Sequence, residues 1–174
     1  MVELCKQGDP AAYTFLYNHC SKEVYNSILR LVDHTGEAED ILQESFITAF
    51  EQIDKFQNRG GFRAWVKRIA INKSIDRIRA RRVRFIELEP ERIFKEDDKL
   101  DEDAYKFSLE AVMDAVQTLP KGARTIFFLF AIENIPHAEI AQMLGMEHAA
   151  VRTQYHRAKH KILKTFTERG FYGK

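Results

Sequence analysis

The segment 135–158 (IPHAEIAQMLGMEHAAVRTQYHRA) constrains the fold most, because it predicts two helices joined by a tight turn. Pro136 suits the first turn of a helix, where its missing N–H would lack a partner in any case. Apolar residues recur at helical spacing up to Leu144, and Gly145 then follows, where a left-handed residue ends a helix without a Cβ clash. A second apolar stripe is spaced by four, three, four and four residues: Val151, Tyr155, Ala158, Ile162 and Phe166. The pattern predicts a helix-turn-helix.

The second of these helices carries basic and hydroxyl-bearing residues opposite its apolar stripe. They are Arg152, Thr153, His156, Arg157 and Lys159. A short turn followed by such a helix is what a reader of the DNA major groove needs. The alternative is an ordinary helical hairpin with a solvated outer face, and the pattern favours DNA binding over it.

The rest of the chain also predicts helices, since it has only 8 glycines and 4 prolines in 174 residues. One helix starts at Pro10 behind an Asp9 cap and runs to about Val32, a second is capped by Thr35, and a third starts at Phe62. The positions expected to be buried in them are Ala12, Phe15, Leu16, Val24, Ile28, Leu31, Ile41, Leu42, Phe46, Ala49, Phe50, Ile53, Trp65, Val66, Ile69, Ala70 and Ile75. We therefore predict an all-α fold of two small helical domains, residues 1–84 and 107–174, joined by an acidic linker over residues 85–106. Further helices are expected from about residue 107 to Leu119 and over residues 124–132.

Charge is segregated along the chain although its total is close to neutral, with 27 Lys and Arg against 26 Asp and Glu. Residues 63–85 hold nine cations against Asp76 alone: Arg63, Lys67, Arg68, Lys73, Arg77, Arg79, Arg81, Arg82 and Arg84. The linker is acidic, and residues 121–174 are basic again. Two basic blocks around an acidic one predict two contacts with a polyanion.

The third helix places Trp65, Ile69, Asn72 and Asp76 on one face, at spacings of four, three and four. One interpretation is a buried network in which the amide and the carboxylate satisfy each other. The other is a groove where an aromatic ring and an amide meet an unpaired base, with cations such as Lys67, Arg68 and Lys73 on the backbone. The local pattern leaves both open.

The second helix carries a polar cluster made of Glu39, Asp40, Gln43 and Glu44. Paired carboxylates permit a hydrolase or metal site, but no histidine cluster, nucleophile elbow or phosphate loop accompanies them. An acidic patch that docks a basic partner is the simpler interpretation. His156 and His160 are too few ligands for a zinc site. We expect no catalytic group, no metal and no cofactor.

Location is indicated by what the sequence lacks. Cys5 and Cys20 stand apart without CxxC spacing, which suits a reducing cytosol. No run of about eighteen apolar residues predicts a membrane span, and the first residues lack the apolar core of a signal peptide. We expect a cytoplasmic protein without membrane insertion.

Four segments in order resemble bacterial RNA polymerase sigma factors of the extracytoplasmic-function type. AEDILQESF (38–46) and FRAWVKRIAINKSIDRIR (62–79) resemble sigma region 2, and LPKGARTIFFL (119–129) and EIAQMLGMEHAAVRTQYHRAK (139–159) resemble region 4. The resemblance implies a non-enzymatic subunit that binds core RNA polymerase, through the β′ clamp in region 2 and the β flap in region 4. It also implies binding to promoter DNA and control by an anti-sigma factor.

The resemblance assigns roles to matching positions. Core polymerase would be bound by Glu39, Asp40, Gln43 and Glu44. The −10 element would be bound by Asn58, Arg59, Trp65, Lys67, Arg68, Asn72, Lys73 and Arg77, with the loop 56–61 capturing a flipped base. The −35 element would be bound by His148, Ala149, Arg152, Thr153, His156 and Arg157. Departures from the usual pattern at Glu147, Ala150, Gln154 and Tyr155 bear on the −35 preference.

The leading hypothesis is thus promoter recognition with −10 melting and transcription initiation. A free-standing helix-turn-helix regulator is the alternative, and it would normally need a dimer interface and a sensor domain. A small carboxylate-dependent hydrolase centred on Asp40 and Glu44 is a third hypothesis.

Overall fold

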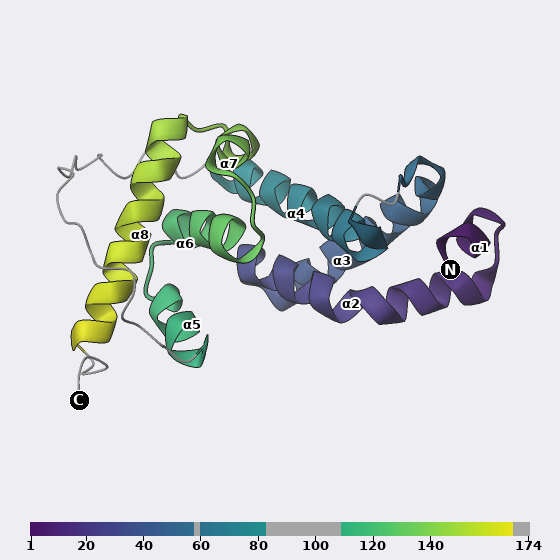
Figure 1. Cartoon of the computed structure of the whole chain (residues 1–174), viewed down its shortest axis with the longest axis horizontal. Coiled ribbons are helices and arrows are strands. Elements are labelled where there is room, and N and C mark those ends of the chain that lie inside the picture. Colours follow the sequence, from purple (N-terminus) through teal and green to yellow (C-terminus); the bar gives the residue numbers. More distant parts are fainter. Residues whose placement is uncertain (58–59, 83–108, 169–174) are drawn as a thin grey trace. The chain divides into compact units, whose positions relative to one another are not determined.

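A computed structural model describes residues 1–57, 60–82 and 109–168 of the chain, and every regular element in these ranges is helical (Figure 1). The predicted all-α fold is confirmed. The chain divides into two compact units, Met1–Arg84 (unit 1) and Phe85–Lys174 (unit 2). The predicted linker, residues 85–106, lies outside the described residues, and so do Asn58 and Arg59.

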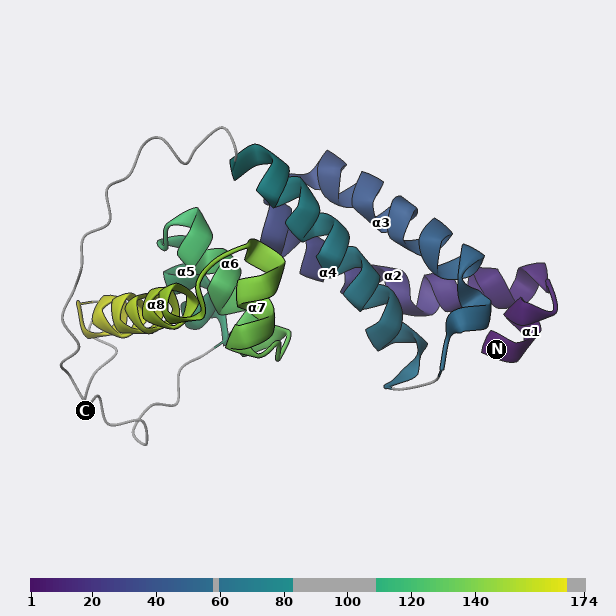
Figure 2. The same ribbon diagram turned by 90° about the horizontal axis from the view of Figure 1, so that it is seen from above.

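Unit 1 consists of α1 (Val2–Lys6), α2 (Pro10–Val32), α3 (Thr35–Glu51), a 3₁₀ turn η1 (Ile53–Lys55) and α4 (Gly61–Arg82). The three long helices α2, α3 and α4 pack against one another in pairs (Figure 2). The start of α2 is as predicted, because the Asp9 side chain accepts a hydrogen bond of 2.8 Å from the Ala11 N–H. Asp33 closes α2 in the left-handed conformation, with φ at 60°.

The cap of α3 differs from the prediction. Thr35 is the first helical residue, and His34 is the cap, with its Nδ1 accepting a 3.2 Å hydrogen bond from the Glu37 N–H. The reason is that Asp33 ends α2 in the left-handed conformation. His34 is then the extended residue before α3, with φ at −152°, which is the position of a helix cap.

The core of unit 1 follows the predicted stripes, and its centre contains the fully buried side chains Val24, Ile28, Ile41, Val66 and Ala70. Truncating one of the isoleucines to alanine would cost about 2–5 kcal/mol at such a site.

Some of the aromatic residues predicted to be buried in unit 1 are not. Phe15 is 48% exposed, because the buried line on α2 runs at intervals of four through Ala12, Leu16 and Cys20 and leaves Phe15 at its margin. Phe50 and Trp65, like the aliphatic Ile69, are only partly buried and pack against the edge of the core.

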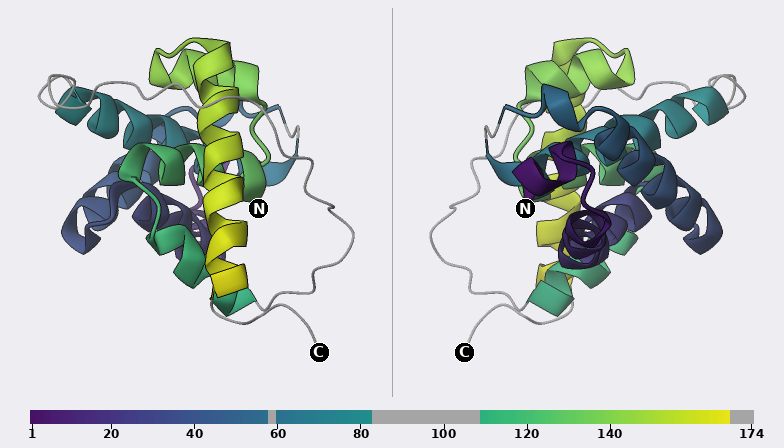
Figure 3. Two further views of the ribbon diagram at one scale, coloured as in Figure 1. Left: turned by 90° about the vertical axis from the view of Figure 1, so that its left-hand side faces the viewer. Right: turned by 90° about the vertical axis from the view of Figure 1, so that its right-hand side faces the viewer.

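Unit 2 consists of α5 (Leu109–Gln117), α6 (Lys121–Phe127), a π-helical turn η2 (Phe128–Ile132), α7 (His137–Leu144) and α8 (His148–Glu168). The helices α5, α6 and α7 all pack on α8, which runs the length of the unit (Figure 3). The short helix predicted for residues 124–132 starts earlier, at Lys121. Its last turn is π-helical, since the Glu133 N–H donates a 3.0 Å hydrogen bond to the Phe128 carbonyl, five residues before it.

The helix-turn-helix corresponds to α7 and α8. Gly145 ends α7 with φ at 62°, and the Met146 N–H bonds to the Ala141 carbonyl at 2.9 Å, which closes the turn as predicted. Pro136 is the cap of α7 rather than part of its first turn. Val151, Ala158, Ile162 and Phe166 are buried, whereas Tyr155 is only partly buried.

Candidate functional site

The predicted polar cluster lies on α3. Glu39, Asp40 and Gln43 are exposed, and the residues at 40, 43 and 47 share one side of the helix because they are spaced by three and four. Ile47 is 57% exposed and lies one turn beyond Gln43 on this side. We call Asp40, Gln43 and Ile47 the outer face of α3. Ile47 was not among the predicted site residues, although its spacing from Asp40 and Gln43 was the available signal.

The fourth predicted member of this cluster, Glu44, faces α4 instead. Its carboxylate accepts a 2.8 Å hydrogen bond from Arg77 and lies 3.9 Å from the Lys73 ammonium. One carboxylate predicted to contact polymerase therefore holds two cations predicted to contact DNA. The sequence pattern did not reveal this pairing, because it depends on how α3 and α4 pack.

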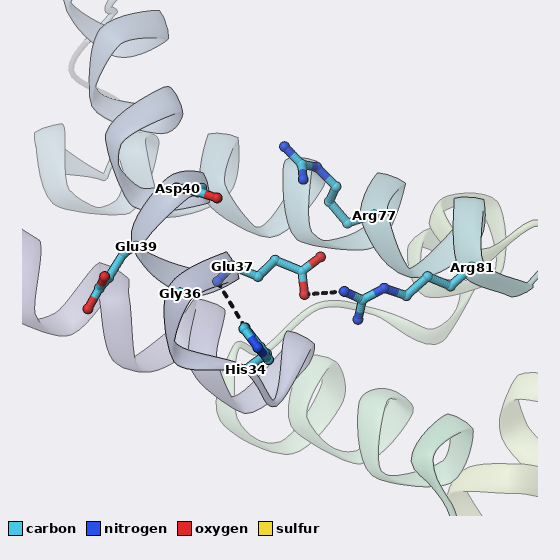
Figure 4. Close-up of a pocket in the computed structure, with 7 residues that line it drawn as sticks. All are labelled: His34, Gly36, Glu37, Glu39, Asp40, Arg77 and Arg81. Atoms are coloured by element: carbon cyan, nitrogen blue, oxygen red, sulfur yellow. Dashed lines mark hydrogen bonds and ion pairs between the residues drawn. The ribbon is translucent and has the colours of Figure 1, made fainter.

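A second ion pair joins the same two helices near the start of α3. The Glu37 carboxylate, only 9% exposed, accepts a 2.6 Å hydrogen bond from Arg81. A surface recess of about 450 Å³ opens here, and its lining residues are His34, Gly36, Glu37, Glu39, Asp40, Arg77 and Arg81. Figure 4 shows the Glu37 side chain reaching Arg81 while its backbone N–H is bound by His34. The recess combines both signs of charge.

The face of α4 that left two interpretations open lies at the surface. Asn72 and Asp76 are both exposed, so the buried amide–carboxylate network is wrong. Trp65 is partly buried and packs against the rings of Phe56 and Phe62, with centroid distances of 5.3 and 5.9 Å. An exposed amide two turns from an anchored, partly open indole is compatible with binding a base.

A cluster at the start of α4 connects this helix to α2. The Glu23 carboxylate pairs with Arg63 at 2.9 Å and with Lys67 at 3.7 Å. Arg63 was not among the predicted site residues. Burial raises the pKa of the nearby Cys20 thiol, and a hydrogen bond from Arg63 only partly opposes that effect. The thiol is thus kept in its unreactive protonated form.

All the residues predicted to contact the −35 element lie on the exposed side of α8. They are His148, Ala149, Arg152, Thr153, His156 and Arg157. The predicted helix therefore presents these side chains together to solvent, as a groove-reading helix must.

An aromatic cluster supports α8 from behind. The Tyr155 ring lies 4.6 Å from the Phe130 ring and 5.0 Å from the His137 ring, and His137 stacks on Phe130 at 4.0 Å. Burial lowers the pKa of His137, and the neighbouring charges of His148, His156 and Arg152 lower it further. The His137 Nε2 is buried without a hydrogen-bond partner among the described residues.

The described residues contain no group of three or more His, Cys, Asp or Glu side chains arranged to hold a metal ion. Likewise, none of the helices in the described ranges is long and apolar enough to cross a membrane.

Comparisons with known proteins match both halves of the chain. Residues 16–84 match the family model of sigma-70 region 2, and residues 109–162 match that of sigma-70 region 4. The ECF RNA polymerase sigma factor SigW of Bacillus subtilis is 31% identical, over 94% of this chain and 93% of that protein. The RNA polymerase sigma-H factor of Pseudomonas aeruginosa is 29% identical, over 94% and 91%.

Solved structures share the fold at lower identity. The structure of CnrH in complex with the cytosolic domain of CnrY aligns with a TM-score of 0.53 and 23% identity, over 96% of this chain and 95% of that one. The sigma factor RpoE of Bartonella quintana, solved with the anti-sigma factor NepR, aligns with a TM-score of 0.51 and 18% identity, over 90% and 97%. The chain belongs to the extracytoplasmic-function group of the sigma-70 family, whose members are non-enzymatic subunits of RNA polymerase in transcription initiation.

Proposed function

We propose that this sigma factor divides its work between its units. Residues 1–84 act as region 2, which binds polymerase and the −10 element, and residues 107–174 act as region 4, which binds the −35 element. Residues 85–106 link the two. The observation that carries the proposal is the exposed, predominantly basic side of α8 in the same chain as the exposed, acidic side of α3.

The outer face of α3 is the polymerase contact in this proposal. Asp40 and the adjacent Glu39 supply charge for a basic partner, Gln43 supplies an amide, and the exposed Ile47 supplies apolar area one turn beyond Gln43. Exposed apolar area beside charged and amide groups is typical of a protein interface. Glu44 stands at the edge of this surface, with its carboxylate directed to α4. We assign the contact to the β′ clamp of core polymerase.

The −10 contact is assigned to α4 and the loop before it. Trp65 and Asn72 would border the melted strand, and the loop 56–61 would hold a flipped base. Extrusion of a base costs a few kcal/mol of unstacking, so favourable contacts must offset it. The remaining assigned residues are Asn58, Arg59, Lys67, Arg68, Lys73 and Arg77, of which the last two are bound by Glu44 in the free chain.

The −35 contact is assigned to α8. Arg152 and Arg157 can donate hydrogen bonds to guanine edges or to phosphates. The Thr153 side chain can contact a base edge or a phosphate. The same unit would bind the β flap of polymerase. Region 2 and region 4 each bind part of the promoter, so neither needs high affinity alone.

Two further assignments follow from the family. We expect an anti-sigma factor to hold this chain inactive, since the similar sigma factor RpoE forms a complex with the anti-sigma factor NepR. We also expect the chain to act in the cytoplasm, where core polymerase and promoter DNA are found.

In vitro transcription tests the proposal. The full chain is added to core polymerase of the same organism, and start sites are mapped on genomic DNA. We expect initiation at a defined subset of promoters. Asp40→Ala should weaken core binding with little change in −35 binding. Folded chain that supports no specific initiation in the absence of any inhibitor would refute the proposal. Tight binding to duplex DNA without polymerase would favour a free-standing regulator instead.

A further inference from the structure

An exposed aromatic pair lies on α2, outside every residue assigned above. Phe15 is 48% exposed, and its ring is stacked on that of His19, with centroids 5.7 Å apart and an angle of 9° between the ring planes. Large aromatic side chains normally bury about 150–250 Å² in a core or an interface. A half-exposed ring that is already held flat against a second ring is therefore a candidate contact surface.

The pair is fixed in place by charged neighbours. An Arg63 guanidinium nitrogen lies 2.9 Å from the His19 Nε2. A guanidinium only donates hydrogen bonds, so the Nε2 is the acceptor and the imidazole carries its proton on Nδ1. Arg63 is held in turn by Glu23, which also binds Lys67. Arg63 thus lies against the ring pair, and the half-exposed Glu23 links it to a second cation, Lys67.

The position of this cluster connects it with the proposed −10 surface. Arg63 follows Gly61 by two residues, at the end of the loop assigned to the flipped base, and Lys67 lies one turn further along α4 and is itself an assigned −10 contact. A strand bound by Arg63 therefore lies beside the His19 ring on α2.

We propose that Phe15 and His19 form a stacking platform for an unpaired base of the melted DNA strand, beside Arg63 in the first turn of α4. This inference rests on the proposed function of region 2. Proteins that hold single strands combine aromatic rings, on which bases stack, with cations that follow the backbone, and this cluster supplies both. Because every base has a π-face, such a platform accepts any base, whereas the loop selects one.

The test uses the full chain, alone and with core polymerase, and a fluorescein-labelled oligothymidylate as the probe. Phe15→Ala should weaken probe binding by about fivefold or more, the lower end of what alanine substitution of a stacking ring costs. Phe15→Trp should retain binding, because it keeps an aromatic face. The matched control is Leu4→Ala, which removes another large apolar side chain, 40% exposed, from the same unit. Circular dichroism checks that each variant is folded.

A direct contact is tested with an oligonucleotide that carries 5-iodouracil. Irradiation should crosslink it at Phe15 or His19 in the wild-type chain. Unchanged affinity in Phe15→Ala, or crosslinks confined to other residues, would overturn the platform. If Phe15→Leu binds the probe as well as the wild type, an aromatic face is not required, and the stacking platform is overturned. Promoter-specific initiation by the wild-type holoenzyme is measured in parallel, so that failure of the platform is distinguished from failure of the proposed function.

Discussion

The two proposed DNA-binding surfaces hold their cations in different ways. On α4, Lys73 and Arg77 are both bound by Glu44, and Lys67 is bound by Glu23. On α8, Arg152 is exposed and forms no ion pair with any carboxylate of the described ranges. A cation that already has a partner must exchange it for a phosphate, whereas Arg152 meets DNA without that exchange. Lys73 and Arg77 should therefore each gain less from DNA than Arg152.

Replacing a carboxylate by a phosphate as the partner of an α4 cation changes the free energy little, but it couples DNA binding to polymerase binding. Ion pairs that are half-exposed contribute about 0–1 kcal/mol each. Glu44 lies at the edge of the proposed polymerase surface and also pairs with Arg77 and Lys73 on α4. A basic group of polymerase that binds the Glu44 carboxylate would therefore release these two cations. By linkage, DNA bound to these cations would favour polymerase binding by the same factor. Within the described part of the chain, no such shared carboxylate restrains Arg152.

The largest effect is expected on α8. Arg152→Ala should reduce binding of the holoenzyme to the −35 half of its promoter by about five- to hundredfold, since a good base contact is worth about 1–3 kcal/mol. Arg77→Ala should reduce promoter binding by only about twofold, because Arg77 also loses its ion pair with Glu44 in the bound state. Fluorescence anisotropy on labelled duplexes from the mapped promoters measures both.

Thr165→Ala is the control for this pair, since its hydroxyl bonds the Lys161 carbonyl on the far part of α8. It should change neither core binding nor −35 binding. Equal losses from Arg77→Ala and Arg152→Ala would show that the internal ion pairs do not distinguish the two surfaces.

A smaller effect of opposite sign is expected from Glu44→Gln. Removing the shared carboxylate should raise the affinity of the free chain for non-specific duplex DNA by about two- to fivefold at low salt. The slope of log affinity against log salt should steepen by about 0.9 for each cation that gains a phosphate. Titrations at several salt concentrations measure this.

Glu39→Gln is the matched control, because it removes one carboxylate from α3 that is exposed and forms no ion pair within the described residues. It corrects for the change in net charge alone. If both substitutions raise DNA affinity equally, Glu44 does not restrain the α4 cations.

The periodic features of both units were predictable from the sequence for a physical reason. Helix starts such as Asp9–Pro10 and the stop at Gly145 depend on local backbone chemistry, and the core stripes depend on a fixed repeat of about 3.6 residues. The exposed side of α8 follows from the same repeat. The cap at His34 was missed because its Nδ1 is an unusual acceptor for this role, whereas Thr35 beside it is a common one.

What the sequence did not reveal depends on packing between helices. The pairing of Glu44 with Arg77 joins residues 33 positions apart, and that of Arg63 with His19 joins residues 44 apart. Periodicity assigns a side chain to a face but does not say which helix covers the margin of that face. Phe15 lies at such a margin, so an apolar residue expected in the core is exposed and available for contact.

The smallest expected effect concerns His137 in the aromatic cluster behind α8. The pKa of His137 lies below its usual value, so the unfolded chain binds this proton more readily than the folded one. Stability should therefore be highest above the usual histidine pKa of about 6.5 and should fall as the pH drops through it, levelling off below the lowered value of the folded state.

His137→Phe keeps a ring on Phe130 and removes the titration, so its melting temperature should depend less on pH than that of the wild type, by about a few degrees over this range. Thermal unfolding by circular dichroism measures the difference, with the exposed His160→Gln as the control that should keep the wild-type slope. If the melting temperature of His137→Phe depends on pH as strongly as that of the wild type, protonation of His137 does not destabilise the ring cluster behind α8.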